Sequence, residues 1–161
     1  MPRKARAIHQ GEYYHILSRG NNKQALFYDA SDFEYYLRTL LHYLHKYDVS
    51  LYHYCLMTNH LHLLMKSESQ DAAISRLMHG VQMVYARYFK KRNRATGHVF
   101  EDRFKHFLIE SDSYLLECGR YIERNPVRAR MVRRSQGLPL VKLLILCLRR
   151  CEQTDYTQPA L

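Results

Sequence analysis

Two strand-like runs joined by only two residues place the strongest constraint on how this chain can fold. Residues 49–57 are rich in β-branched and aromatic side chains, and a second such run begins at His60, directly after Thr58 and Asn59. So short a connection can join only antiparallel strands, which predicts a hairpin. Because side chains alternate between the faces of a strand, His60 and His62 lie on the same face.

Two histidines on one strand face can bind the same metal ion, because both imidazoles reach toward one point. The pair alone leaves other interpretations open, since the chain contains ten histidines. His60 and His62 could equally lie at the surface or be satisfied by hydrogen bonds in the core.

Strand and helix patterns alternate along the first 125 or so residues. Apolar residues recur at helical spacing after Ser31, which forms a possible capping box with Glu34, and again after Asp71, and Ser111 is a candidate helix cap. The expected order of elements is β-α-β-β-α-β-α, which indicates an α+β protein with a ferredoxin-like βαββαβ antiparallel sheet, its helices on one face, and a further C-terminal helix. We expect strands over residues 13–19, 49–57, 60–66 and 104–109, and helices over residues 31–47, 71–91 and from 111 onward.

Composition indicates a soluble, cytoplasmic protein. The four cysteines of the 161 residues show no spacing typical of a disulfide framework or a thiolate zinc site, so we expect free thiols in a reducing compartment. No apolar segment follows the basic start of the chain, which excludes a signal peptide. The apolar run over residues 138–148 is too short to span a bilayer and contains Pro139 and Lys142.

The chain is strongly basic, and its positive charge is concentrated in two blocks. Lys and Arg total 25 against 15 Asp and Glu, which gives a net charge of +10, and the excess lies mainly in residues 87–94 and 120–134. Neutralising DNA phosphates with such residues releases counterions and favours binding. The alternative is two solvated helix ends whose cations interact with the helix dipole. We favour a nucleic-acid partner.

Tyr121 and Asn125 are four residues apart, which places them on one helix face if the helix continues that far. Pro126 marks a potential boundary. Asn125 could instead cap a separate short helix, and Tyr121 could fill the core as one of 14 tyrosines.

Taken together, these motifs resemble the single-tyrosine HUH transposases, and in particular the REP-associated tyrosine transposases. The similarity extends over about residues 10–134, in the order of that family. The matching segments are YHILSRGNN (14–22), MTNHLHLL (57–64), GHVFEDRFK (97–105) and YIERNPVRA (121–129).

The resemblance implies a role for each candidate site residue. His60 and His62 would bind a divalent cation, Asn125 would supply a third, amide ligand, and Tyr121 on the C-terminal helix would be the catalytic nucleophile. The implied reaction is cleavage and rejoining of single-stranded or hairpin DNA through a 5′-phosphotyrosine intermediate. A phenol is a weak nucleophile at neutral pH, which is consistent with help from a metal.

The implied cofactor is Mg²⁺ or Mn²⁺. Imidazole and amide ligands suit Mn²⁺, Zn²⁺ or Ni²⁺, whereas Mg²⁺ prefers oxygen, so Mg²⁺ rests on the resemblance alone. We expect DNA contacts from basic residues of the two blocks and of the matched segments. These residues are Arg19, Arg87, Lys90, Lys91, Arg92, Arg94, Arg103, Lys105, Arg120, Arg124 and Arg128.

The resemblance ends after Arg134. Related proteins commonly carry a tryptophan-containing segment there, whereas this chain has no Trp. We therefore divide the chain into a transposase domain over residues 1–134 and a divergent tail over residues 135–161, helical or disordered, which a frameshift or truncation would explain. A homodimer and a protein that acts alone are both compatible with the sequence.

Three other functions compete with transposition. A domesticated nickase would process hairpin repeats by the same chemistry without mobilising DNA. A non-catalytic nucleic-acid-binding module would use its histidines structurally. A metal hydrolase would cut with a water nucleophile and would not need Tyr121.

Overall fold

A computed structural model of the protein describes residues 8–128, with side chains through Asn125. The order and type of every predicted element are confirmed. The chain divides into two compact units after Asn125, and the predicted domain boundary after Arg134 and the tail over residues 135–161 lie outside the described residues. The elements are β1 (Tyr13–Arg19), η1 (Asn21–Lys23), α1 (Ala30–Tyr47), β2 (Val49–Met57), β3 (His60–Ser67), α2 (Ala73–Asn93), β4 (Lys105–Ile109) and α3 (Asp112–Arg128).

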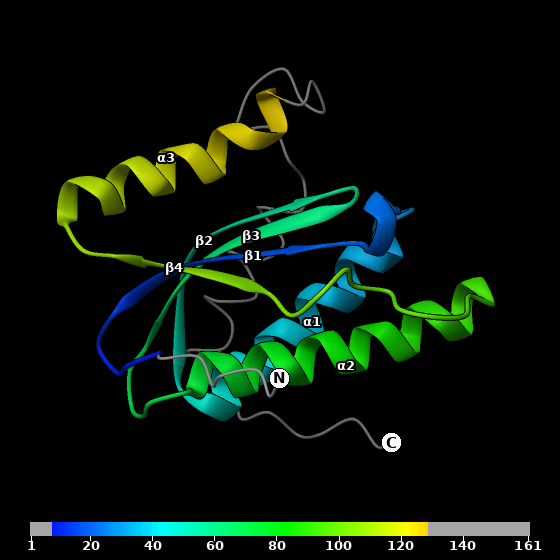
Figure 1. Ribbon diagram of the computed structural model, residues 1–161, viewed down its shortest axis with the longest axis horizontal. Coiled ribbons are helices and arrows are strands. Elements are labelled where there is room, and N and C mark those ends of the chain that lie inside the picture. The colour runs from blue at the N-terminus through cyan, green and yellow to red at the C-terminus, as the bar shows by residue number, and fades with distance from the viewer. Residues whose placement is uncertain (1–7, 129–161) are drawn as a thin grey trace, which may run out of the picture. The chain divides into compact units, whose positions relative to one another are not determined.

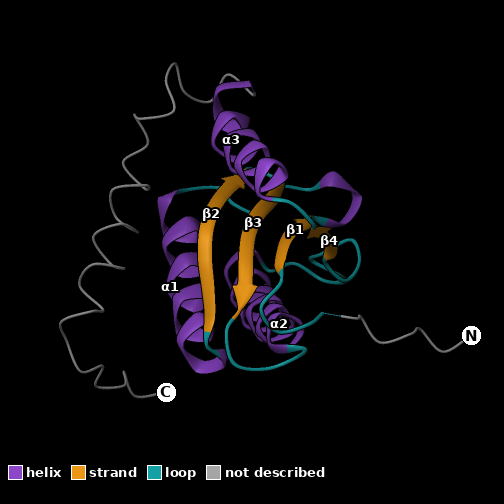
Figure 2. Cartoon of the chain, turned by 90° about the vertical axis from the view of Figure 1, so that its left-hand side faces the viewer, coloured by secondary structure: helices purple, strands orange, loops and turns teal. Residues whose placement is uncertain are grey.

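The four strands form one antiparallel sheet in the order β2-β3-β1-β4, and Figure 2 shows them side by side in that order. The predicted hairpin is confirmed, since β2 pairs with β3 from Val49↔Ser67 to Met57↔His60. β1 lies between β3 and β4, so residues distant in sequence become neighbours. This is the predicted ferredoxin-like sheet.

The main hydrophobic core lies between the sheet and helices α1 and α2 (Figure 1). Alternate residues of the two central strands point into it, including Ile16 of β1 and Leu61, Leu63 and Met65 of β3, all with no exposed surface. Burial of each such side chain contributes about 1.5–3 kcal/mol. The same alternation sends the other residues of these strands, His60 and His62 among them, to the opposite face.

Helix α3 packs on that opposite face of the sheet (Figure 1). Its contact with the sheet is a second, smaller apolar cluster. The buried members are Cys55, Met57, Leu64, Ile109, Cys118 and Ile122. The sheet is therefore covered on both faces, and α3 is the element that brings Tyr121 over β3. None of the described helices is long and apolar enough to cross a membrane.

Asp29 caps the first helix, and the predicted capping box of Ser31 and Glu34 is wrong. The Asp29 carboxylate accepts hydrogen bonds from the backbone N–H of Ser31 at 2.9 Å and of Asp32 at 3.3 Å. Helix α1 therefore begins at Ala30, and Ser31 lies inside its first turn. A carboxylate at this position is also favoured by the helix dipole.

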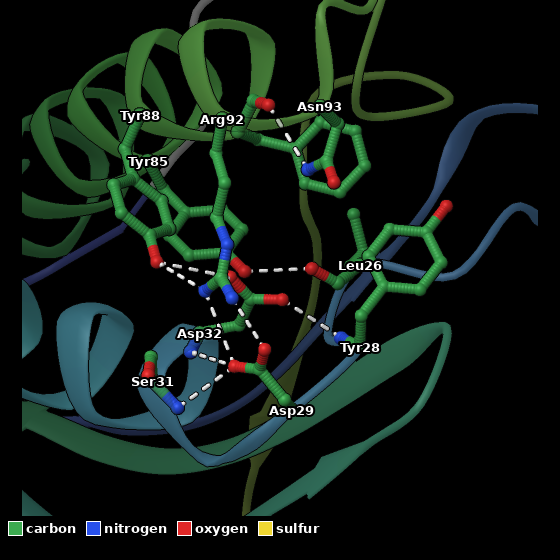
Figure 3. A network of polar contacts seen from close by, with 10 residues as sticks. Leu26, Tyr28, Asp29, Ser31, Asp32, Tyr85, Tyr88, Arg92 and Asn93 are labelled. Carbon is green, nitrogen blue, oxygen red and sulfur yellow. Dashed lines mark hydrogen bonds and ion pairs between the residues drawn. The ribbon is translucent and has the colours of Figure 1, made fainter.

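Arg92, near the end of α2, ties the two core helices together (Figure 3). Its guanidinium forms ion pairs with Asp29 and, at 2.7 Å, with Asp32, and it donates to the Tyr88 hydroxyl at 2.8 Å. Asp32 is completely buried and also accepts from the Tyr88 hydroxyl and the Tyr28 N–H. Hydrogen bonds to Asp29 and Tyr88 raise the pKa of Arg92. Arg92, one of the predicted DNA contacts, thus has a role in the fold.

Replacing Asp32 by alanine should lower the free energy of unfolding by about 3 kcal/mol, because it leaves the Arg92 guanidinium and the Tyr28 N–H without their buried acceptor. Glu34→Ala, on the same helix, is the control and should change it by less than about 0.5 kcal/mol. Urea unfolding of both variants measures the difference. Equal losses of unfolding free energy in Asp32→Ala and Glu34→Ala would contradict the role given to Asp32.

Candidate nucleic-acid cleavage site

His60 and His62 lie on the face of β3 that α3 covers. Their positions follow from strand alternation, because Leu61 and Leu63 point into the core on the other side. The two imidazole ring centroids are 5.2 Å apart and the rings are nearly perpendicular, at 84°. The predicted neighbouring pair of histidines is present.

A hydrogen bond to Asn59 orients the His60 ring. The Asn59 side chain donates from Nδ2 to the Lys23 carbonyl at 3.2 Å, so its Oδ1 faces His60 as an acceptor. Nδ1 of His60 lies 2.7 Å from that oxygen and must donate its proton to it. In a neutral imidazole this leaves the lone pair on Nε2, which is the form that binds a metal.

The His62 ring meets a third histidine, His15 of β1. Nδ1 of His62 lies 3.0 Å from Nε2 of His15, and the rings stack with centroids 5.2 Å apart at 21°. His62 is 6 % exposed. Sequence reasoning did not select His15, although the residue lies inside the matched segment 14–22. The missed signal is that, by alternation, His15 points to the same sheet face as His62 once β1 pairs with β3.

Burial favours the neutral form of all three histidines. Burial, followed by the nearby His15 and His60, lowers the pKa of His62 to about 4. Burial and the charge of Arg19 lower the pKa of His60, and burial lowers the pKa of His15. Neutral imidazoles keep the lone pairs that a cation needs.

Close contact with His53 of β2 sets the position of α3. A Cβ atom at Gly119 would lie 2.8 Å from Nε2 of His53, so any larger residue would require the His53 ring to move. The other side of the His53 ring, at Nδ1, lies 3.0 Å from the Glu123 carboxylate. Cys118 and Ile122 are buried against the sheet next to these contacts.

Tyr121 projects from α3 beside His62. Its ring centroid is 5.7 Å from that of His62, with the rings perpendicular at 89°, and 6.3 Å from that of His15. The side chain is 43 % exposed, so the interpretation of Tyr121 as a core residue is wrong. The Tyr121 ring lies at a steep angle to both histidine rings while much of the side chain stays open to solvent.

Asn125 lies one helical turn after Tyr121, on the same helix. Helix α3 continues through Pro126 to Arg128, so the alternative of a separate short helix beginning at Asn125 is wrong. Pro126 lacks the N–H that would bond to the carbonyl of Ile122, and its ring crowds that carbonyl, yet the helix continues past it to Arg128. Nδ2 of Asn125 is buried and has no hydrogen-bond partner among the described residues.

The donor types of His60, His62 and Asn125 are ones that a divalent cation accepts. Among the described residues, no group of three or more His, Cys, Asp or Glu side chains could hold a metal ion. A third ligand drawn from the described part of the chain, beside His60 and His62, would therefore be of another type. A half-turn of the Asn125 amide exchanges its unpartnered nitrogen for an oxygen, which is a suitable ligand atom.

The predicted basic residues occupy several parts of the fold. Arg87, Lys90, Lys91 and Arg94 belong to the end of α2, on the side of the sheet away from Tyr121. Arg120 and Arg124 are exposed on α3, beside Tyr121. Arg128 is the last residue of α3, and its side chain lies outside the described residues.

The remaining basic residues lie close to the histidines or at the sheet edge. Arg19 pairs directly with His60 in the β1–β3 register and donates to both carboxylate oxygens of Glu101, at 2.7 and 2.9 Å. Lys105 begins β4 opposite Leu17. Arg103 lies in the preceding loop and is exposed.

The lowered pKa of His62 predicts acid sensitivity. An unfolded histidine titrates near 6.5, so below that pH the unfolded chain binds more protons than the folded one, and stability falls as the pH drops toward about 4. The shift of the buried ring from 6.5 to about 4 should account for about 3 kcal/mol of this fall. In urea unfolding at several pH values, His62→Gln should abolish this part of the loss of stability. His79→Gln, at an exposed histidine of α2, should leave it unchanged. An unchanged pH dependence in His62→Gln would contradict this.

Comparison with known proteins identifies the family. The chain has no match among curated proteins. Among solved structures it is similar to a REP-associated tyrosine transposase bound to a REP hairpin, with a TM-score of 0.67 and 14 % identity over 86 % of this chain and 80 % of that one. It is also similar to a putative transposase from Deinococcus radiodurans R1, with a TM-score of 0.48 and 17 % identity over 77 % of this chain and 97 % of that one.

The first of these likenesses shows the fold, and the family assignment rests on a separate match. A model of the IS200-like transposase family matches residues 9–125, a range that includes β3, His15, Tyr121 and Asn125. Because this match spans well over half of the sequence, the protein belongs to the IS200-like transposase family and has a transposase-type role in DNA processing.

Proposed function

We propose that this protein cleaves and rejoins single-stranded DNA through a 5′-phosphotyrosine formed on Tyr121. The observation that carries the proposal is the placement of an exposed phenol 5.7 Å, between ring centroids, from His62, one of two neutral histidines on the same strand face. A tyrosine that only filled space would not need a large exposed surface beside such a pair.

In the proposed step, Oη of Tyr121 forms a bond to a phosphorus of the DNA backbone. The bond from that phosphorus to the 3′ oxygen breaks, the phenol loses its proton, and the 3′ oxygen gains one. The products are a 5′-phosphotyrosine and a free 3′-hydroxyl. Attack by another 3′-hydroxyl reverses the step and rejoins DNA, so one phosphate ester replaces another and no external energy source is needed.

His60 and His62 would hold a divalent cation through Nε2, and Asn125 through its amide oxygen. A cation bound there supplies Lewis-acid polarisation of the scissile phosphate. We propose Mg²⁺ or Mn²⁺, with Mn²⁺ better suited to nitrogen ligands. The chain's own contribution is to favour the neutral form of both imidazoles by burial, to engage their Nδ1 atoms through Asn59 and His15, and to place Tyr121 beside His62.

The DNA would pass over the end of the sheet where β1 ends and β3 begins. Figure 1 shows α2 and α3 both ending toward this end of the sheet, on its opposite faces, and β1 ends there with Arg19. Hydrogen bonds from Gln24 to the carbonyls of residues 98 and 99 join the loop after α2 to the segment after β1. The solved REP-associated transposase is bound to a REP hairpin, which supports hairpin DNA as the substrate class.

Tyr121→Phe should abolish a metal-dependent covalent adduct with single-stranded hairpin DNA from the flanks of the gene, because it removes the attacking oxygen. Tyr114→Phe is the matched control, since Tyr114 is also exposed on α3, at 46 %, and should keep the adduct. The adduct is detected on a denaturing gel after the protein and DNA have been incubated with Mn²⁺ or Mg²⁺. DNA cut by Tyr121→Phe would point to a water nucleophile, and binding without any adduct from the wild type would point to a binding module.

His60→Ala and His62→Ala should each reduce adduct formation at least about 100-fold while changing hairpin affinity by less than about threefold. The reason is that phosphate contacts come from the basic residues, whereas the histidines serve the chemistry. Gel-shift titration and the adduct assay at one salt concentration separate the two effects. A parallel loss of affinity and cleavage in a folded variant would contradict this division.

A further inference from the structure

We propose that His15 is a positioning residue, which fixes the tautomer of His62 and so directs the lone pair of its Nε2 toward the cation. The inference rests on the proposed function, because it assigns His15 a task in the same site. His15 is outside the set of two histidines and one amide expected as ligands. Its position in the fold gives it a separate role.

The argument begins with the two nitrogens of His62. A neutral imidazole has one N–H and one lone pair, and only the lone pair can bind a cation. Nδ1 of His62 is occupied by His15, 3.0 Å away at Nε2, so Nε2 is the atom left for a ligand role. That role requires Nδ1 of His62 to carry the proton and to donate it to His15.

His15 must then accept, which assigns its own proton to Nδ1. The position of the ring is fixed by the backbone, because His15 lies on a strand that is paired on both sides, with Leu64 of β3 and Phe107 of β4 opposite it. Its ring stacks on His62 and approaches the rings of Phe107 at 6.0 Å and Tyr121 at 6.3 Å. The His15 ring, which carries the accepting Nε2, is therefore held in place by aromatic rings on several sides.

The same logic already applies to His60, whose Nδ1 donates to the Asn59 oxygen. Both histidines thus have Nδ1 engaged and Nε2 available. For His60 the partner can only accept, whereas for His62 the partner is an imidazole that could also donate. The wrong tautomer of the His15–His62 pair would place a proton on Nε2 of His62 and block the site, so the identity of residue 15 matters.

The test measures Mn²⁺ binding to the full chain by calorimetry, in the absence of DNA. His15→Phe keeps an aromatic ring but removes the acceptor and should weaken Mn²⁺ binding 10- to 100-fold. His15→Gln restores an acceptor near the position of Nε2 and should bind within about threefold of the wild type. His79→Phe, at an exposed histidine of α2, is the control and should bind as the wild type does.

The outcomes separate this inference from the proposed function. If His15→Phe binds Mn²⁺ as tightly as the wild type, while the wild type still forms a Tyr121-dependent adduct, only the role of His15 is overturned. If His15→Gln binds as weakly as His15→Phe, the acceptor is not what matters, and the inference also fails. Absence of Mn²⁺ binding by the wild type both with and without hairpin DNA overturns both proposals.

A spectroscopic measurement keeps the inference testable if His15→Phe does not fold. In the metal-free wild type at about pH 8, ¹⁵N chemical shifts of the imidazoles should show a protonated Nδ1 and an unprotonated Nε2 in His62, and an unprotonated Nε2 in His15. A merely structural contact would not select this tautomer. A proton on Nε2 of His62 would overturn the proposal.

Discussion

The antiparallel pairing of β1 with β3 is the constraint on which the site depends. In its register Arg19 faces His60 and Leu17 faces His62, which sets His15 diagonally beside His62 on the same face. A slip of one residue in β3 would turn His60 and His62 into the core and Leu61 and Leu63 out of it. Because three fully buried side chains of β3 oppose that slip, the apolar core fixes the positions of the metal-binding candidates.

A second constraint holds α3 on the sheet. The backbone groups of a helix bond within the helix itself. Side-chain contacts therefore determine where α3, and with it Tyr121, lies on the sheet. Gly119 removes the atom that would collide with His53, and the His53 ring then reaches Glu123 one turn further along. Cys118 and Ile122 add the apolar part of the contact. Tyr121 is thereby presented to His62 from a rigid element and not from a loop, which suits a nucleophile whose direction of attack matters.

The sequence predicted what local patterns determine. Alternation over residues 49–66 is sufficient for the hairpin and for the shared face of His60 and His62, and helical spacing is sufficient for α1, α2 and α3. It did not predict the contacts of His15 with His62 or of His53 with Glu123, because these pairs are separated by 47 and 70 residues and depend on register and helix docking. The cap of α1 was misassigned for a similar reason, since Asp29 is also held by Arg92, 63 residues away.

The positive charge of the chain serves the site in two ways that reinforce each other. A net charge of +10 attracts a polyanion, and the charge of Arg19, near His60, also lowers the pKa of that histidine. A cation and a proton compete for the same imidazole lone pair, so any field that disfavours the proton leaves the ligand free. The same field would repel a metal ion on its own, but DNA phosphates entering the site would offset that repulsion. In the proposed site, phosphate and metal should therefore bind cooperatively, because the basic residues bind the DNA phosphate and the histidines bind the metal ion.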